Sequence, residues 1–291
     1  MIVIADKPGQ LGNMLLLFSH FIGRAIESDF SVSCLAFENY ADWFPSTQGD
    51  LLCRFPAQRS AFNDARLRRW LYRASNFSVR ALARLGGNLG FFRSITIYDW
   101  DSIILLNDPA FIELARSKRI TFVRGWRFRD YDCMKKHADR IRDFFRPHAA
   151  NQQRIDKLIF QARRDADVLV GVHIRHGIIH FDNTRKWFYS AKRYAEMMGE
   201  VVELFPGRRV AFLICSDWPQ DPKMYAAFKV TYGTGELIED MYAFAKCDYL
   251  LGAPSTFTMW SSFYGQVPLN KVETADQPQR LSDFVVFETL G

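Results

Sequence analysis

Val168-Leu-Val-Gly-Val-His-Ile-Arg-His-Gly177 is an apolar run that ends in a short charged cluster and a glycine. Such a run, bounded by charge and by glycine, predicts a strand that is buried on both faces of a parallel sheet. His173 and Arg175 lie two positions apart, so on a strand they point to the same side. Ligands of open α/β sheets bind beyond the carboxyl ends of the strands. We therefore expect either an anion site formed by Arg175 or a structural pair between Arg175 and a buried carboxylate, with His173 packed at the strand end.

Length and composition are those of a globular protein with two domains. The chain has 291 residues, of which 48% are hydrophobic and 24% charged, and a chain of this length normally forms two domains, each with its own core. The net charge is +6. A basic balance is compatible with three kinds of partner, namely nucleic acid, an anionic membrane surface or an anionic substrate such as a sugar nucleotide.

Cysteine usage and hydropathy predict a cytoplasmic location. The five cysteines are an odd number, widely spread and without a Cys-x-x-Cys pair, which predicts buried thiols in a reducing compartment. Residues 1–5 are too few for a signal peptide and run directly into Asp6 and Lys7. No window approaches the roughly 18 consecutive apolar residues of a membrane span. We expect a cytoplasmic protein that can contact the inner face of the membrane.

Strand-like and helix-like segments alternate in both halves, which predicts two doubly wound α/β domains, 1–150 and 151–291. The first half opens with a strand at 2–5, the turn Pro8-Gly-Gln-Leu-Gly-Asn13 and a helix from Met14 to Glu27. Strand, glycine turn and helix is the layout of a loop that binds phosphate or backbone groups. The alternative is a tight turn in which Asn13 caps the helix.

The segment from Arg66 to Gly87 (residues 66–87) predicts a cationic amphipathic helix. Its basic residues alternate with apolar ones, and no acidic residue occurs between Asp64 and Asp99. The basic residues are Arg66, Arg68, Arg69, Arg73, Arg80 and Arg84. Three interpretations remain: a membrane-interfacial helix, an ordinary surface helix packed on its domain, and a nucleic-acid contact, for which no recognition motif is present.

Polar residues follow three predicted strands of the second half: His173 with Arg175, Ser216 with Asp217, and Ser255 with Thr256. Parallel strands share a direction, so these ends meet at one edge of the sheet. Asp217 can accept two hydrogen bonds from a guanine edge, while Ser255 and Thr256 stand where hydroxyl and helix N–H groups hold phosphate. Phe257 packs either on a base or in the core. Together these residues predict a nucleotide-diphosphate pocket.

A metal site is the alternative for the histidines of this region. His173, His176 and His180 are close in sequence. On a strand His173 and His176 point to opposite faces, and three-histidine sites need convergent geometry. We therefore expect no metal and no other cofactor.

Four motifs, in order, resemble the α-1,2-fucosyltransferase family and its fucosyltransferase relatives. Gly9-Gln-Leu-Gly-Asn13 resembles their N-terminal GGxGNQ motif, and His173-Ile-Arg-His-Gly177 resembles their HxRxGD motif. Phe212-Leu-Ile-Cys-Ser-Asp217 is similar to a strand that ends in Ser-Asp. The stretch 239–248, followed by Pro254-Ser-Thr-Phe-Thr-Met-Trp260, is similar to the C-terminal motifs of the family.

The resemblance implies a GT-B fold, with two Rossmann-like domains that face each other across a cleft. It implies an inverting, metal-independent transfer of L-fucose from GDP-β-L-fucose to a hydroxyl of a surface glycan, either an oligosaccharide or a glycolipid. Arg175 would hold the diphosphate and stabilise the leaving group. The other implied contacts are His173 with the donor, Asp217 with guanine, Ser255, Thr256 and Phe257 with phosphate and base, and Gly12 and Asn13 on the cleft side of the first domain.

One position departs from the family pattern. The Asp that follows the motif glycine is Ile178 here, and an inverting transfer needs a group that accepts the proton of the acceptor hydroxyl. Asp182 and His180, in the same loop, are the candidates. Ile178 also leaves room for two alternatives, a transferase for another GDP-sugar and a non-catalytic protein that binds nucleotide sugars or glycans.

Overall fold

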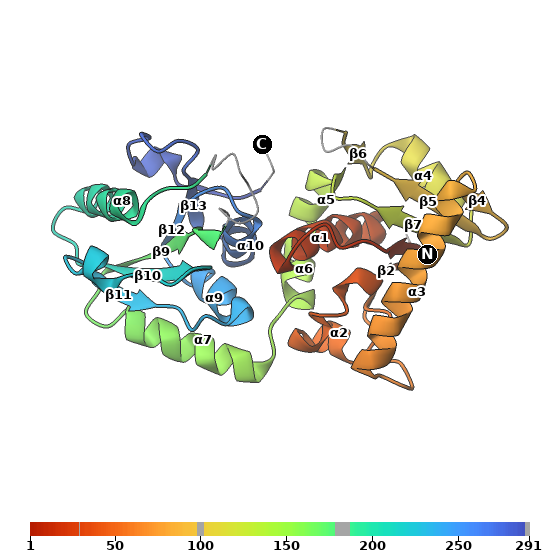
Figure 1. The fold of residues 1–291 in the computed structure, drawn as a ribbon, viewed down its shortest axis with the longest axis horizontal. Coiled ribbons are helices and arrows are strands. Elements are labelled where there is room, and N and C mark those ends of the chain that lie inside the picture. Colours follow the sequence, from red (N-terminus) through yellow and green to blue (C-terminus); the bar gives the residue numbers. More distant parts are fainter. Residues whose placement is uncertain (29, 98–101, 178–186, 289–291) are drawn as a thin grey trace. The chain divides into compact units, whose positions relative to one another are not determined.

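The computed structural model describes residues 1–28, 30–97, 102–177 and 187–288. The chain divides into two compact units, Met1–His148 (unit 1) and Ala149–Gly291 (unit 2). In the described part, each unit contains a six-stranded sheet with helices packed against it (Figure 1). The expected α/β class with two sheet-containing units is confirmed.

The sheet of unit 1 reverses its strand order at its first strand. Its order is β3 (Arg54–Phe55), β2 (Val32–Cys34), β1 (Ile2–Ile4), β7 (Ile120–Arg124), β5 (Phe92–Thr96) and β4 (Asn88–Leu89). The four central strands are parallel, and β3 and β4 pair antiparallel at the edges. β6 (Ile104–Leu105) and β8 (Phe128–Arg129) form a separate parallel pair. β2 ends at Cys34, because residues Leu35–Phe37 form a 3-10 turn.

The predicted layout of strand, turn and helix occurs at the start of unit 1, but the helix boundary and the role of Asn13 differ from the prediction. α1 (Leu11–Ser28) begins three residues earlier than expected, and most of its side chains are buried. Asn13 therefore lies inside the first turn and is not the N-cap. Its Nδ2 donates to the Pro8 carbonyl at 3.1 Å, which closes the turn. A Cβ on Gly9 would lie 2.1 Å from that same Nδ2, so the turn requires a glycine there.

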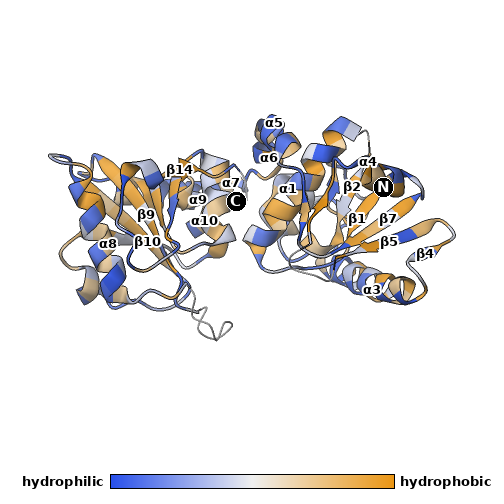
Figure 2. Ribbon diagram, turned by 90° about the horizontal axis from the view of Figure 1, so that it is seen from above, coloured by the Kyte–Doolittle hydropathy of each residue, from blue (hydrophilic) through white to orange (hydrophobic). Residues whose placement is uncertain are grey.

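Two further helices cover opposite faces of this sheet. α4 (Pro109–Arg116) lies on the side of Thr121, whose hydroxyl donates to the Ala115 carbonyl, while α3 (Ala65–Arg84) faces Phe122 (Figure 2). Residues 131–144 form two helices, α5 (Tyr131–Lys136) and α6 (Ala138–Phe144), because His137 between them leaves helical geometry. No helix among the described residues is long and apolar enough to cross a membrane.

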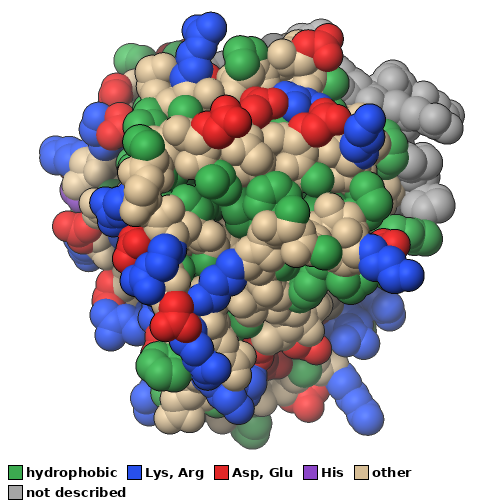
Figure 3. Space-filling model, turned by 90° about the vertical axis from the view of Figure 1, so that its left-hand side faces the viewer, with side chains coloured by type: hydrophobic (Ala, Val, Ile, Leu, Met, Phe, Trp, Pro, Cys, Tyr) green, Lys and Arg blue, Asp and Glu red, His purple; other side chains and the backbone are tan. Residues whose placement is uncertain are grey.

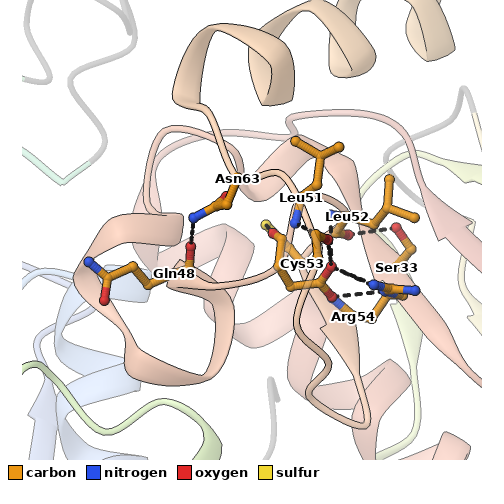
Figure 4. Close-up of polar contacts among 9 residues, drawn as sticks. Ser33, Gln48, Leu51, Leu52, Cys53, Arg54 and Asn63 are labelled. Carbon is orange, nitrogen blue, oxygen red and sulfur yellow. Dashed lines mark hydrogen bonds and ion pairs between the residues drawn. The ribbon is translucent and has the colours of Figure 1, made fainter.

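The expected irregular segment between β2 and α3 is ordered by one buried carboxylate. Asp50 accepts hydrogen bonds from the backbone amides of Leu52 and Arg54, from the Arg54 guanidinium and from the Ser60 hydroxyl. The Ser33 hydroxyl donates to the Leu52 carbonyl at 2.7 Å and ties this turn to β2 (Figure 4). Short elements arise within the segment, including α2 (Pro45–Gln48) and β3.

The opening stretch forms the central strand of unit 2. The order is β11 (Lys229–Tyr232), β10 (Val210–Ser216), β9 (Val168–Ile174), β12 (Tyr249–Gly252), β13 (Pro268–Lys271) and β14 (Val285–Val286). All pairs are parallel except β13 with β14. All seven residues of β9 are buried, as predicted. The chain moves from β9 toward β11 and then returns to β12, so the strand order reverses between β9 and β12.

Alternate residues of β9 face two different helical layers. Val168, Val170 and Val172 pack with α8 (Ala191–Glu203) in one core cluster. Residues 171 and 173 face α9 (Leu237–Phe244) and α10 (Thr256–Gly265). A Cβ on Gly171 would lie 2.9 Å from the ring of Phe244, so glycine makes room for this ring. α7 (Ala149–Ala162) packs against α9.

Candidate functional site

Arg175 lies at the switch point of the sheet of unit 2. It directly follows β9, and its Nη1 donates to the Pro254 carbonyl at 3.2 Å. Pro254 belongs to the short connection between β12 and α10. The guanidinium is therefore held between the ends of the two strands that flank the strand-order reversal, where α/β sheets bind ligands. The Pro254 carbonyl is thus one partner of the guanidinium.

His173 is buried beside Arg175 and is held by aromatic rings. Its imidazole stacks on Phe257, with ring centroids 4.8 Å apart, and meets the edge of Phe244 at 6.4 Å. Its Nδ1 is buried without a hydrogen-bond partner among the described residues. Burial lowers the pKa of His173 to about 4; the negative charge of Asp217 opposes this shift in part, and the positive charge of Arg175 adds a smaller lowering. The ring is thus neutral near pH 7 and can offer one N–H donor.

The buried neutral imidazole predicts a loss of stability in mild acid. The unfolded chain protonates His173 below its ordinary pKa of 6.5, whereas the folded chain resists until about 4. The unfolded state binds the proton first, so the stability of unit 2 falls with pH between these values, by roughly 2–3 kcal/mol. Amide hydrogen exchange of β9 and β10 as a function of pH measures this loss of stability in unit 2 alone.

His173→Gln provides the control for this pH dependence. It should remove most of the decline in exchange protection of β9 between pH 6.5 and 4. His20 of unit 1 is also buried, with a pKa lowered to about 3 by burial, so acid destabilises unit 1 in the same direction. An undiminished decline in the His173→Gln protein would show that another group of unit 2 titrates.

The residues predicted on the phosphate side surround the first turn of α10. Ser255 is the N-cap, and its hydroxyl accepts the Phe257 amide at 3.2 Å. Thr256 is the first helical residue. The remaining N–H groups of the first turn have no partner inside the helix, and with the helix dipole they favour an anion. One ring face of Phe257 is covered by His173, so its best-supported role is to hold that ring.

Asp217 lies one residue beyond β10 and is tied to the end of β9. Its Oδ1 accepts the Gly177 amide at 2.9 Å. A Cβ at Gly177 would lie 2.9 Å from the other carboxylate oxygen, so this contact requires glycine. Asp217 is exposed overall. The structure thus brings His173, Arg175 and Asp217 to one sheet edge, as predicted.

A cavity of about 330 Å³ adjoins Asp217 at the ends of β10 and β11. Its lining includes Asp217, Trp218, Gln220, Tyr232, Gly233 and Asp240. Burial raises the pKa of Asp240, whose carboxylate accepts the backbone amides of Thr234 and Gly235 and so fixes the loop before α9. Trp218, Tyr232 and Asp240 were not predicted as site residues from the sequence. Of these three residues, only Trp218 could have been predicted as a site residue, because it directly follows the Ser216-Asp217 strand end in the sequence.

The side chain of His176 lies on the opposite face of the sheet from His173. One ring nitrogen contacts the Tyr189 carbonyl at 2.8 Å, and the other contacts Gln220 at 3.1 Å. It therefore does not converge with His173. Within the described ranges, no group of three His, Cys, Asp or Glu side chains is arranged to hold a metal ion. His180, Asp182 and Ile178 lie outside the described residues.

The two residues predicted in unit 1 lie in its first βα turn. Gly12 is buried in α1, and Asn13 is partly buried with its amide nitrogen bonded to Pro8. Nearby, the Lys7 ammonium is 2.6 Å from Glu38 and 4.5 Å from the centre of the Tyr72 ring. Asn13 therefore supports the loop, while Lys7 lies at the same edge of the unit 1 sheet.

Comparisons with known proteins match the fold and not the sequence. No protein-family model matches the chain, and a search of curated proteins finds no similar sequence. A mutant of Arabidopsis thaliana FUT1 in complex with GDP has a TM-score of 0.62 at 13% identity, over 95% of this chain and 72% of that one. NodZ α-1,6-fucosyltransferase soaked with GDP-fucose has a TM-score of 0.55 at 14% identity, over 96% of this chain and 97% of that one.

A third structure, fucosyltransferase NodZ from Bradyrhizobium, has a TM-score of 0.56 at 16% identity and covers 96% of each chain. At these identities the comparisons establish the fold. The chain has the α/β fold of these fucosyltransferases, which is the GT-B class expected from the sequence.

Proposed function

We propose that unit 2 binds a GDP-sugar and that the protein is a glycosyltransferase. The observation that carries this proposal is the cationic corner at the β9–β12 switch point. There, Arg175, the neutral ring of His173 and the first turn of α10 meet. Two of the solved structures with this fold contain GDP or were soaked with GDP-fucose, which supports the same class of ligand here.

The geometry of unit 2 supports a definite orientation of the nucleotide. The diphosphate lies against Arg175 and the α10 N-terminus, and the base lies toward Asp217 and the 330 Å³ cavity. β12 and β10 are two strands apart, about 10 Å, which is comparable to the span from the base to the diphosphate. The free edge of the Asp217 carboxylate can accept hydrogen bonds from guanine N–H groups.

In the proposed reaction, an acceptor hydroxyl attacks the anomeric carbon of the sugar with inversion. The bond from that carbon to the phosphate oxygen breaks, and GDP leaves with the electron pair. Arg175 stabilises the charge that develops on the diphosphate, which replaces the role of a metal ion. A base accepts the hydroxyl proton. Asp182 and His180 remain the candidates for this base.

The proposed donor is GDP-β-L-fucose, and the proposed acceptor is an oligosaccharide or glycolipid of a surface glycan. We further propose a cytoplasmic protein that contacts the inner face of the membrane through residues 66–87, with no metal or other cofactor. A transferase for another GDP-sugar would use the same phosphate contacts. A non-catalytic binding protein is the alternative that Ile178 supports.

The face of the molecule drawn in Figure 3 has no basic patch for a nucleic-acid partner. Basic and acidic side chains are intermixed on the face shown in Figure 3, so the basic surplus does not gather there. In the sequence, basic residues without intervening acidic ones are concentrated in 66–87 instead. Nucleic acid is therefore not an expected partner.

Calorimetric titration with GDP, GDP-fucose, GDP-mannose and UDP tests the proposal. We expect GDP to bind with and without a chelator, and more tightly than UDP. Asp217→Asn should reduce the preference for GDP over UDP by about 10-fold, because the amide repels one of the guanine donors. Absence of binding to all four ligands would refute the proposal, and binding without sugar transfer would favour the non-catalytic alternative.

A further inference from the structure

A groove of about 630 Å³ lies between α3 and the sheet of unit 1. Val3, Ile120 and Phe122 of the sheet form its floor, and Ala74 and Ala81 of α3 form part of its wall. Its lining has no charged side chain, and its polar side chains are serine hydroxyls. The volume is in the range of small-ligand sites, about 300–1,000 Å³. α3 thus covers this face of the sheet without filling the space beneath it.

Large apolar side chains stand at the mouth of this groove and remain exposed to water. The exposed fraction is 61% for Trp70, 75% for Phe77 and 69% for Leu85. On α3 the groove is lined by residues 70, 71, 74, 75, 77, 78, 81, 82 and 85, which form a stripe of about 160°. Leu82 is buried at one border of this stripe, and Val79, which does not line the groove, is buried beyond that border and attaches the helix to the unit. The exposed stripe is therefore not needed to hold α3 in place.

A row of arginines lies directly beside the apolar stripe. Arg66, Arg69, Arg73, Arg80 and Arg84 fall within a sector of about 60° of the helix and are exposed. None of the five forms an ion pair with a residue that the structure describes. Arg68, expected on the same cationic face, is instead turned inward, buried and paired with Asp42. Five positive charges without an ion-pair partner in the described part of the chain thus border the groove.

We propose that this groove takes up one hydrocarbon chain of an anionic lipid from the membrane surface, while the arginines of α3 bind anionic headgroups. Charge complementarity selects this occupant, because an unpaired row of arginines favours an anionic surface and each adds to the attraction. Trp and Phe at the border between apolar and charged residues are typical of membrane interfaces. The inference deepens the membrane contact proposed above and rests on it, and does not depend on nucleotide binding.

Flotation with phosphatidylserine-containing vesicles and with phosphatidylcholine vesicles provides the test. The full-length protein should bind the first and not the second. Ala81→Phe fills the groove and keeps every arginine, so it should weaken vesicle binding about tenfold or more without changing GDP binding. Phe77→Ser serves as a second variant in case Ala81→Phe does not fold. It alters only an exposed residue at the rim of the groove and should also weaken vesicle binding.

Charge reversal separates headgroup binding from chain binding. Arg69→Glu with Arg73→Glu should abolish binding to phosphatidylserine vesicles, whereas Lys157→Glu with Lys223→Glu, the same charge change on unit 2, should leave most of it. Brominated acyl chains should quench the fluorescence of the native protein, and much of this quenching should be lost in Trp70→Phe.

Three results would overturn the proposal. They are equal binding to neutral vesicles, undiminished binding by the folded Ala81→Phe and Phe77→Ser proteins, and a dimer of the native protein that Ala81→Phe dissociates. The last result would mean that a second copy of the chain covers the groove. GDP titration of the same variants stays unchanged in every case, which distinguishes this inference from the proposed function of unit 2.

Discussion

Arg175→Ala should weaken GDP binding by about 100-fold and lower the rate of sugar transfer by at least as much. A charge-assisted hydrogen bond to a phosphate contributes about 1.5–3 kcal/mol, and the guanidinium can form two. Loss of one donor aimed at developing negative charge typically costs about 10²- to 10³-fold in kcat. The guanidinium is already positioned by its bond to Pro254, so little ordering accompanies ligand binding.

Arg175→Lys separates the charge from its geometry. Lysine keeps the charge but lacks the planar fork and cannot reproduce both contacts, so its affinity should lie between those of the native and alanine proteins. Arg209→Ala is the matched control, because Arg209 pairs with exposed Asp167 at the opposite edge of the same sheet. Calorimetry on all three proteins measures the effect. Native GDP affinity in Arg175→Ala, with Arg209→Ala also unchanged, would move the nucleotide site elsewhere.

Trp260→Ala should have the largest effect on stability, about 3–5 kcal/mol for unit 2. Trp260 is fully buried in α10, and its indole N–H donates to the Tyr242 hydroxyl of α9 at 3.3 Å. Its ring also packs on Phe263 at 5.5 Å. The substitution leaves a cavity and removes one hydrogen bond of the Tyr242 hydroxyl, between two helices that frame the β12–α10 connection.

Hydrogen exchange of the β9 and β10 amides isolates this effect from unit 1. Exchange that requires unfolding of unit 2 should accelerate by about 100- to 4,000-fold, since each 1.4 kcal/mol corresponds to a factor of ten. Phe160→Ala is the control, because this α7 side chain is 73% exposed and should change little. GDP should recover part of the lost protection if unit 2 binds it. Unchanged exchange in Trp260→Ala would show that α10 is not part of the cooperative core.

The hydrophobic pattern predicted the long elements well and the short ones poorly. The helix expected from Met14 to Glu27 occurs as Leu11–Ser28, and the apolar run at 168–174 is the buried central strand. Two-residue strands such as β3 and β4 have too few residues for a periodicity. The division of the helix at His137 also escaped prediction, because it coincides with a contact between His137 and Glu27, 110 positions away.

The sequence was sufficient to predict which strand ends form the candidate site, but not which contacts its residues make. The sequence alone determined that His173, Arg175, Asp217 and Ser255 lie at one sheet edge, because parallel strands end on the same side. Tertiary structure decided their partners. Arg175 meets a carbonyl, Asp217 meets the Gly177 amide and Ser255 caps its own helix.

The same distinction holds for α3. Its amphipathic, arginine-rich character follows from the local spacing of apolar and basic residues, which the sequence determines completely. Whether its apolar side chains pack on the sheet or border an open groove depends on how far the helix stands from β1, β5 and β7. That distance is set by side chains from distant segments, such as Phe122 of β7 and Asp42, which pairs with Arg68 of α3. Periodicity reports the direction of a side chain along its own element, and only the packing of many elements determines what that side chain meets.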